Sequence, residues 1–402
     1  MENFNLINWE PLKFLFPVSL GILFSVYVTQ FSYLDEGITL LAVILCCMVI
    51  ASKLVISYSQ IMISLLVLFS IFTLHISVYK VTVVDVYLGA FLIFKFFAIL
   101  FIVSHLFQNK KFALIFAYVA LVISLLGLAI NLAIPSVYNN FFELREIYRD
   151  GSLRYAGAFL NPNLSGIVLS GSAAICANLS RNLYKYRLVI LIFMLLIASF
   201  IFVSRTTQIF IMFLIILPYI ASRNKLRNYV PILVALMCFL LFSFYLAPSS
   251  QTTTSNLNML NQSQEANVRV LILTSGIRLA IENFPYGAGF GTFASKADVG
   301  MKLFQDLGID QHYAIKQQRG LHDSSVAVIL GQLGVIGLVM YLYIVKLLLS
   351  KQAEFKNCAN TVMVFFFILG LVTPFFFSAI MAMVVILSIK ITLQTRDYDT
   401  RK

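Results

Sequence analysis

Residues 188–222 read LVILIFMLLIASFIFVSRTTQIFIMFLIILPYIAS, an apolar run interrupted at Ser204-Arg205-Thr206-Thr207-Gln208. A membrane-spanning helix needs about 20 apolar residues, so the run has the length of two short helices joined at the polar interruption. Flanking charges support this interpretation, because lysine and arginine collect in cytoplasmic loops. A single helix would put the two basic clusters on opposite sides of a membrane, whereas a hairpin puts both on one side. The clusters are Arg181/Lys185/Arg187 before the run and Arg223/Lys225/Arg227 after it.

The composition of the whole chain also indicates a membrane protein. Of its 402 residues, 60% are hydrophobic and 11% are charged. A soluble domain averages roughly 25% charged residues, so this chain has too few polar groups to cover a surface that faces water. The net charge of +12 is explained by cytoplasmic loops, so we expect no nucleic-acid partner. The five cysteines show no spacing typical of zinc binding or disulfides.

Twelve membrane-spanning helices account for the apolar runs. The run at 359–390 carries Pro374 at its middle and is interpreted, like 188–222, as two short helices. With both termini cytoplasmic, this count puts the basic clusters inside, with Lys80 as an exception. The predicted fold is an all-α polytopic membrane protein, a single domain over residues 1–402. The runs lie near 12–30, 37–52, 57–79, 85–107, 112–134, 159–179, 188–222, 229–247, 323–345 and 359–390.

Three pieces of the chain fall on the outer side in this arrangement. They are a loop at 135–158, the turn at Arg205, and a long segment at 248–322 between the spans near 229–247 and 323–345. The long segment opens with a polar stretch that is typical of a flexible loop. It continues as a predicted amphipathic helix over about 268–284 and a glycine-rich turn, PYGAGFG, at 285–291.

Arginines gather on this outer side, although orientation favours basic residues inside. A guanidinium stays charged and offers a fork of donors suited to phosphate oxygens. For Arg145 and Arg149 a solvated loop is the alternative, because acidic residues lie among them. Arg205 lies between apolar helices, where a charge costs at least ~2.5 kcal/mol unless it is partnered or reaches water; capping of the helix ends is its alternative role. The outer arginines are Arg145, Arg149, Arg154, Arg205, Arg269, Arg278 and Arg319.

Arg269 and Arg278 share the predicted helix at 268–284. Nine residues at roughly 100° each place them on opposite sides, so a straight helix aims at most one of them at a common site. Ordinary helix salt bridges also explain each one, because Glu282 lies four residues after Arg278 and Glu265 four before Arg269.

His322 is the candidate catalytic residue, at the start of the run near 323–345. Imidazole is the usual side chain for taking a proton from a hydroxyl near neutral pH, and Asp323 is a candidate for orienting it. The other histidines, His75, His105 and His312, offer no comparable setting, and the role of the buried Lys95 stays open. Motifs for a P-loop or a zinc protease are absent from the sequence, and Asp397 and Asp399 lie in a charged tail, so we expect no metal and no cofactor.

Several segments together resemble the O-antigen ligase and polymerase superfamily of bacterial membrane glycosyltransferases. RYAGAFLNPN at 154–163 resembles the Arg…Gly…Asn-Pro-Asn segment of the polymerases, and Ser204-Arg205-Thr206 is similar to the arginine turn of the ligases. Residues 267–289 resemble the loop-helix arginine with its following Pro…Gly-x-Gly, and Arg278 to Gly289 fits an arginine-x10-glycine pattern. Leu321-His322-Asp323 before Gly331, Gly334 and Gly337 resembles the family's histidine at the start of a glycine-spaced helix, with Asp323 in place of Asn or Ser. Eleven residues separate Arg154 from Gly166, where ten would match a second such pattern.

The resemblance implies a metal-independent glycosyltransferase of the membrane-embedded C type in the bacterial inner membrane. A polymerase would move a growing glycan from undecaprenyl diphosphate onto a new carrier-linked repeat unit, with His322 acting on the acceptor hydroxyl. Its implied partners are the carrier-linked oligosaccharide, the lipid bilayer and a chain-length regulator protein. An O-antigen ligase, which delivers the glycan to lipid A-core, is the alternative, and a flippase or transporter is the rival from another class. The residues implied in diphosphate binding are Arg154, Arg205, Arg269, Arg278 and Arg319.

Overall fold

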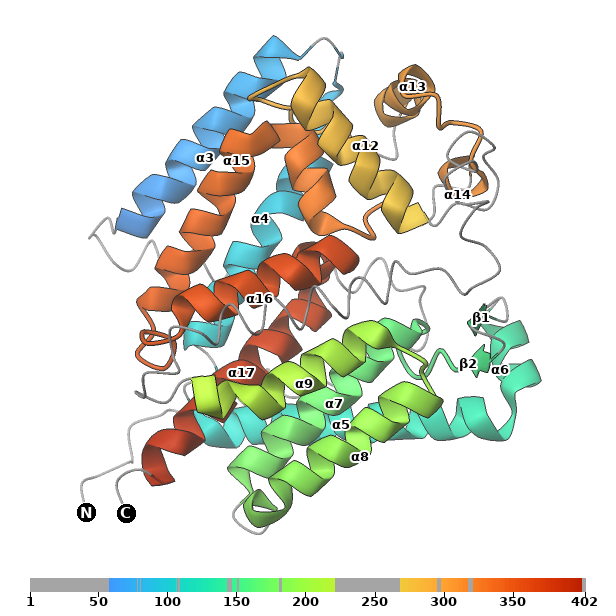
Figure 1. Ribbon diagram of the computed structural model, residues 1–402, viewed down its shortest axis with the longest axis vertical. Helices are drawn as coiled ribbons and strands as arrows, with labels where there is room; N and C mark the ends of the chain where they lie inside the picture. The colour runs from blue at the N-terminus through green and yellow to red at the C-terminus, as the bar shows by residue number, and fades with distance from the viewer. Residues whose placement is uncertain are drawn as a thin grey trace.

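Helices form almost all of the described part of the chain, with one hairpin of two short strands (Figure 1). The computed structural model describes residues 58–77, 79, 81–105, 107, 109–142, 147–149, 152–180, 183–220, 268–294, 298–316 and 321–399. The helices predicted near 12–30, 37–52 and 229–247 lie outside these residues. The elements are α3 (Tyr58–Ile76), α4 (Val83–His105), α5 (Lys110–Ala133), α6 (Pro135–Phe141), β1 (Ile147–Arg149), β2 (Ser152–Arg154), α7 (Pro162–Leu179), η2 (Tyr184–Tyr186), α8 (Arg187–Phe200), α9 (Arg205–Ile220), α12 (Val268–Glu282), α13 (Asp298–Asp306), α14 (Tyr313–Lys316), α15 (Ser325–Ser350), α16 (Ala359–Val372), η4 (Phe375–Phe377) and α17 (Ala379–Asp399).

Both predicted interruptions are confirmed, and each divides its apolar run into two helices. The run at 188–222 forms α8 and α9, and the four residues 201–204 make the turn between them. The run at 359–390 forms α16 and α17, with Thr373 extended and a short 3-10 turn, η4, after Pro374. Proline has no N–H to continue a helix, and the polar Ser204 caps the start of α9, so both breaks follow from local sequence.

Among the described residues, three helices are long and apolar enough to cross a bilayer: Asp85–Ser104, Lys110–Ala133 and Ser325–Ser350. Large apolar side chains also face outward along α3, α5 and α8, where Leu68, Leu126 and Phe200 are 62%, 57% and 77% exposed. A hydrocarbon environment accepts such faces, whereas water disfavours them. The described structure is therefore consistent with a helical membrane protein. Three such helices do not establish the predicted count of twelve, which stays a prediction.

The helix predicted near 323–345 is bent, which the sequence did not indicate. Gly334 in α15 has φ 65° and ψ −166°, a conformation outside the helical region, and it divides α15 into two arms (Figure 1). The glycine-rich turn at 285–291 packs into this bend: Ala288 N donates to Gly331 O at 2.8 Å and Gly289 N donates to Gln332 O at 3.1 Å. The turn thus satisfies two carbonyl groups close to the break in the helix.

Gln332 fixes the same junction from its side chain. Its Oε1 accepts from Gly291 N at 3.2 Å, and its Nε2 donates to Phe293 O at 2.6 Å. The segment is enclosed on its other side by α3, since Ser77 Oγ donates to Ala288 O at 2.7 Å. A glycine-rich loop that could have exposed its N–H groups to a phosphate is instead a buried structural element.

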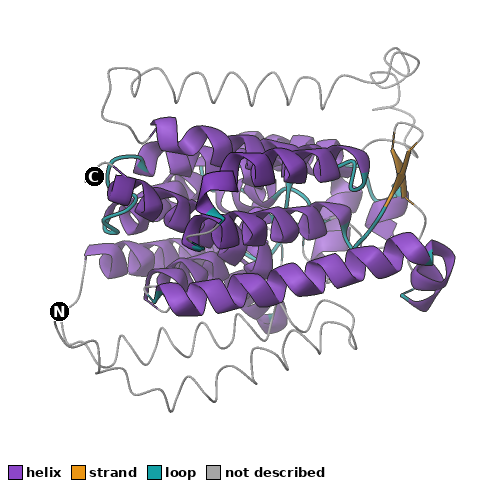
Figure 2. Ribbon diagram, turned by 90° about the horizontal axis from the view of Figure 1, so that it is seen from below, coloured by secondary structure: helices purple, strands orange, loops and turns teal. Residues whose placement is uncertain are grey.

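The segments predicted as outer loops contain further structure. The loop at 135–158 holds α6 and the β1–β2 hairpin, in which Tyr148 pairs with Leu153. The helix predicted over 268–284 is confirmed as α12, and it buries one face against α15, where a Cβ on Gly276 would lie 2.5 Å from Ala327 O. Figure 2 shows the helices running alongside one another, with the strands at one end of the bundle.

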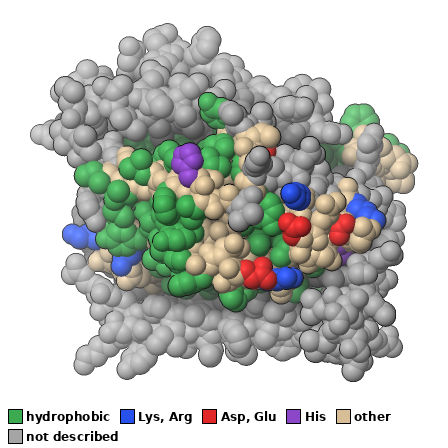
Figure 3. All heavy atoms as spheres, turned by 90° about the horizontal axis from the view of Figure 1, so that it is seen from above, with side chains coloured by type: hydrophobic (Ala, Val, Ile, Leu, Met, Phe, Trp, Pro, Cys, Tyr) green, Lys and Arg blue, Asp and Glu red, His purple; other side chains and the backbone are tan. Residues whose placement is uncertain are grey.

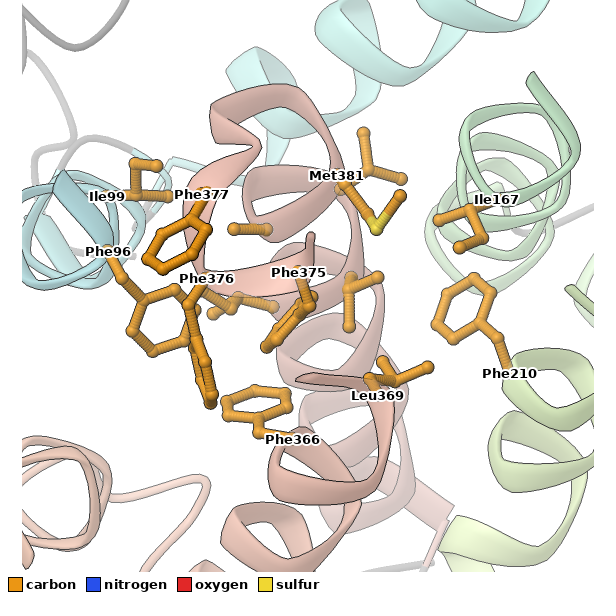
Figure 4. Close-up of a cluster of buried hydrophobic side chains, with 14 of the residues drawn as sticks. Phe96, Ile99, Ile167, Phe210, Phe366, Leu369, Phe375, Phe376, Phe377 and Met381 are labelled. Atoms are coloured by element: carbon orange, nitrogen blue, oxygen red, sulfur yellow. The ribbon is translucent and has the colours of Figure 1, made fainter. Parts of the chain in front are cut away.

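The core lies where α17 passes between the two halves of the described bundle. Phe96 of α4 makes edge contacts with Phe376 and Phe366, at 4.8 Å and 5.8 Å between ring centroids. On the other side of α17, Ile167 of α7 and Phe210 of α9 lie near Met381 (Figure 4). The α16–α17 break is therefore buried against helices from both halves of the chain.

Candidate functional site

Four helices begin at one end of the described bundle. The helices α7 and α9 run in the same direction, because two successive hairpins connect them through α8. The helix α17 runs parallel to α7: a Cβ on Gly171 would lie 2.4 Å from Val384, and Asn178 Nδ2 donates to Thr392 Oγ1 at 3.2 Å. The start of α15 joins them, since Ser325 N donates to Thr373 O at 3.3 Å in the α16–α17 break.

Each of these four N-termini has a side-chain cap, as helix starts favour. The positive ends of four helix dipoles consequently lie at this end of the bundle, and each is equivalent to roughly half a positive charge. Such an arrangement favours an anion. The caps are Asn161 for α7, Ser204 for α9, Ser324 for α15 and Ser378 for α17.

Arg154 belongs to a network that joins two segments distant in sequence. Its Nη2 donates to Asn163 Oδ1 at 3.0 Å, and its Nε donates to Phe202 O at 3.0 Å. The strand β2 thereby supplies an arginine that connects the start of α7 with the α8–α9 turn. Arg154 and Phe202 are 48 residues apart in sequence and adjacent in space.

Ser204 completes this network next to Arg205. Ser204 Oγ donates to Asn163 Oδ1 at 2.8 Å, and Thr207 Oγ1 donates to the Asn163 carbonyl oxygen at 3.3 Å. Arg205 is the first residue of α9 and is partly buried. The predicted capping role belongs to Ser204, because its Oγ accepts from Thr207 N at 3.2 Å.

Arg269 and His322 come together at the start of α15. Arg269 Nε donates to Asp323 Oδ2 at 3.1 Å, and the two side chains are 20% and 34% exposed. His322 is partly buried, with its ring 5.8 Å from that of Phe377 in η4. Asp323, a sequence candidate for orienting His322, pairs with Arg269 in this structure. Arg269 of α12 thus pairs with the residue that follows the candidate catalytic histidine in sequence.

Arg278 faces away from this pair. Its Nε donates to Glu282 Oε1 at 2.7 Å, with side chains 55% and 48% exposed, which confirms the predicted helix salt bridge. Its Nη1 also donates to Leu307 O at 3.5 Å. Charged side chains of both signs lie close together at one side of the face seen in Figure 3, amid hydrophobic side chains.

The helix α13 is attached to the loop between α3 and α4. Tyr79 donates from its hydroxyl to Asp306 Oδ2 at 3.0 Å. Partial burial, with this hydrogen bond and the negative charge of Asp306, raises the pKa of Tyr79 to about 12. With the bond from Arg278 to Leu307 O, this bond attaches the end of α13 to both the α3–α4 loop and α12.

Other sequence candidates fall elsewhere. Arg319 and the side chains of Arg145 and Arg149 lie outside the described residues. Lys95 is 3% exposed in α4, with Nζ 5.6 Å from the centroid of the Phe91 ring. His312 is buried near α14, whereas His75 is exposed on α3.

Two polar residues were not recognised from sequence as parts of the site region. Asn163 lies within the segment that resembles the polymerases, and Gln332 lies in an apolar run. The sequence does indicate a structural role for Gln332, because a buried amide without hydrogen-bond partners is energetically unfavourable in an apolar run.

The elements that carry the two arginine groups meet at the α16–α17 break. The helices α7 and α9, whose first turns join Arg154 and the Arg205 turn, contact α17, and His322 contacts Phe377 in η4. Figure 4 shows Ile167 of α7 and Phe210 of α9 beside Met381, with Phe377 on the other side of the break. The structure thus brings the sequence candidates together in two pairs, Arg154 with the Arg205 turn and Arg269 with His322-Asp323. The elements that carry the two pairs both pack against the buried α16–α17 break.

Substitution of the Arg269–Asp323 pair tests its strength. In a double-mutant cycle with Arg269→Gln and Asp323→Asn, we expect a coupling of about 1 kcal/mol, because one charge-assisted bond lies partly out of water. The matched exposed pair, Arg278→Gln with Glu282→Gln, should give no more than about 0.5 kcal/mol. Thermal unfolding in detergent micelles measures both cycles. Equal coupling energies in the two cycles would show that partial burial does not strengthen the Arg269–Asp323 ion pair.

Among the described residues, no group of three or more His, Cys, Asp or Glu side chains is placed to hold a metal ion. Arginines, helix N-termini and one histidine make up the site instead, and this combination suits an anionic group and a transferable proton. No protein-family model, curated protein or solved structure matches the chain. The site therefore has to be interpreted from its own chemistry.

Proposed function

We propose that the chain is a surface-polysaccharide polymerase of the O-antigen type in the bacterial inner membrane. It would transfer a growing glycan from undecaprenyl diphosphate onto a new undecaprenyl-diphosphate-linked repeat unit at the periplasmic face. Both termini would be cytoplasmic, the chain would span the membrane about twelve times, and the segment 248–322 would be periplasmic. A chain-length regulator is a further proposed partner.

One observation carries the proposal: four helix N-termini occur at one end of the bundle together with Arg205, Arg269 and His322. Helix dipoles and guanidinium groups stabilise a diphosphate most as it gains charge on leaving. The same end of the bundle holds the imidazole that the transfer needs. The resemblance of these segments to the polymerase and ligase superfamily supports the same reaction class.

The reaction follows from these groups. The acceptor hydroxyl oxygen attacks the anomeric carbon of the donor glycan, and the bond from that carbon to the diphosphate oxygen breaks. His322 accepts the hydroxyl proton, or positions the hydroxyl, as the new glycosidic bond forms. The diphosphate leaves with the bonding electrons, and Arg205 with Arg269 stabilises its negative charge.

An O-antigen ligase is the second candidate, because Ser204-Arg205-Thr206 is similar to the arginine turn of the ligases. The two reactions share the donor and differ in the acceptor. Gene deletion separates them: loss of a polymerase leaves one repeat unit on lipid A-core, whereas loss of a ligase leaves none. The Asn-Pro-Asn segment at 161–163 favours the polymerase.

Reconstitution tests the proposal directly. Purified protein in detergent is incubated with undecaprenyl-diphosphate-linked repeat units, and the products are separated by gel electrophoresis. We expect a ladder of longer carrier-linked glycans, and Arg205→Ala should slow it by about 10²-fold, as removal of one charge-stabilising donor does in other enzymes. Lys185→Ala, in the basic cluster at the far end of α8, is the control. If no extended glycan forms while the protein moves carrier-linked units across vesicles, a flippase is the better assignment.

A further inference from the structure

Asn163 occupies the centre of the network beside Arg205. It is 5% exposed, and its Oδ1 accepts two hydrogen bonds, one from Arg154 and one from Ser204. Its main-chain carbonyl accepts a third from Thr207. One buried asparagine thus contacts β2 and the α8–α9 turn through its carboxamide and the first turn of α9 through its main-chain carbonyl.

The turn that Asn163 contacts has an unfavourable backbone. Val203 has φ 45°, in the left-handed region where a β-branched residue is a genuine outlier. Such a conformation persists when the surrounding structure over-determines it. Here Phe202 and Ser204, the residues on either side, are the two that Arg154 and Asn163 hold.

The helices that carry the network are also closely packed against each other. A Cβ on Gly166, one turn below Asn163 in α7, would lie 2.5 Å from Thr207 Oγ1. The helices α7 and α9 are therefore in contact at their first turns, so a displacement of Asn163 is transmitted to the α9 start. Arg205 is the first residue of that helix.

We propose that Asn163 is a positioning residue that fixes the orientation of the Arg205 side chain. Arg154 contributes by holding the α8–α9 turn to β2 through hydrogen bonds. Arg154 then supports the site without itself having to bind the diphosphate. The inference rests on the proposed function in one respect, since Arg205 is taken to bind the anionic group of the carrier. It adds that the Asn-Pro-Asn segment acts through Arg205.

Four variants test this in the purified protein: Asn163→Leu, Asn163→Asp, Arg205→Ala and the double variant Asn163→Leu/Arg205→Ala. The probe is farnesyl diphosphate, a short polyprenyl diphosphate, and its Kd is measured by calorimetry beside glycan extension. Asn163→Leu should raise the Kd about tenfold, as expected for the loss of roughly 1.4 kcal/mol. Asn163→Asp keeps an acceptor oxygen for both donors, so its melting temperature should stay closer to the wild type than that of Asn163→Leu, whereas its negative charge beside Arg205 weakens anion binding by itself.

The double variant distinguishes positioning from direct binding. If Asn163 acts through Arg205, Asn163→Leu should add less than about twofold to the Kd in the Arg205→Ala background. Effects that multiply would overturn the positioning role. Should Asn163→Leu fail to fold, Ser204→Ala takes its place, since it removes one of the same bonds.

Failure of the proposed function has a different signature. If Arg205→Ala alters neither the Kd for farnesyl diphosphate nor glycan extension, then Arg205 is not the anion-binding group and the proposed function loses its support. If Arg205→Ala weakens binding while Asn163→Leu does not, the proposed function stands and the positioning role is wrong. The melting temperature of each variant reports its folding separately.

Discussion

His322→Ala should reduce glycan extension by about 10²- to 10⁴-fold, the range that general acid–base groups contribute. The imidazole lies one residue from the Arg269–Asp323 ion pair and packs against Phe377. Its position at the start of α15 gives it access to the end of the bundle where four helices begin. Initial rates with purified protein and carrier-linked repeat units measure the effect.

The loss should be specific to catalysis. Binding of farnesyl diphosphate to His322→Ala should stay close to wild type, because the arginines remain. His75→Ala, on the exposed side of α3, is the matched histidine control and should retain full activity. Normal polymer from His322→Ala in cells would remove the histidine from the mechanism.

Gly334→Ala should destabilise the protein by at least about 3 kcal/mol, through backbone strain together with steric overlap. An added Cβ would lie 2.1 Å from Pro285 O and 2.6 Å from Gly287 N, and the backbone has φ 65°. The glycine-rich turn and the bent helix cannot both keep their places around that methyl group. A lower melting temperature in detergent, with loss of monodisperse protein, is the expected measurement.

Gly308→Ala is the matched control, because it separates strain from overlap. Gly308 has φ 72° with no atom within 4 Å of an added Cβ. Its substitution should cost only the strain of a left-handed residue, about 1–2 kcal/mol. If Gly334→Ala is no more harmful than Gly308→Ala, the packing of residues 285–291 into the bend is not needed for stability.

The helix hairpins were predictable because their signals are local. Arg205 and Pro374 each interrupt an apolar run, and the flanking charges assign the sides of a membrane without any tertiary information. The Arg278–Glu282 bridge was predictable for the same reason, since residues four apart are neighbours on any helix.

Features that depend on distant contacts were not predictable from one sequence. The spacing of Gly331, Gly334 and Gly337 is equally compatible with a straight helix, and the turn that bends it lies more than 40 residues earlier in the chain. Arg269 had a local candidate partner in Glu265, outside the described residues, yet it pairs with Asp323, 54 residues away. The hydrogen bond that Asn163 accepts from Ser204 likewise joins residues 41 positions apart.

The enclosure of α7 has a consequence for how the protein is made. Seventeen of its 18 residues are buried, and its small residues allow close approach of its neighbours. One of those neighbours, α17, is synthesised some 200 residues after α7. During translation, the Gly, Ser and Asn residues of α7 therefore lack the contacts with α17 until α17 has been made. Chains truncated before α17 are therefore expected to leave α7 without this cover and to be substrates for quality-control proteolysis.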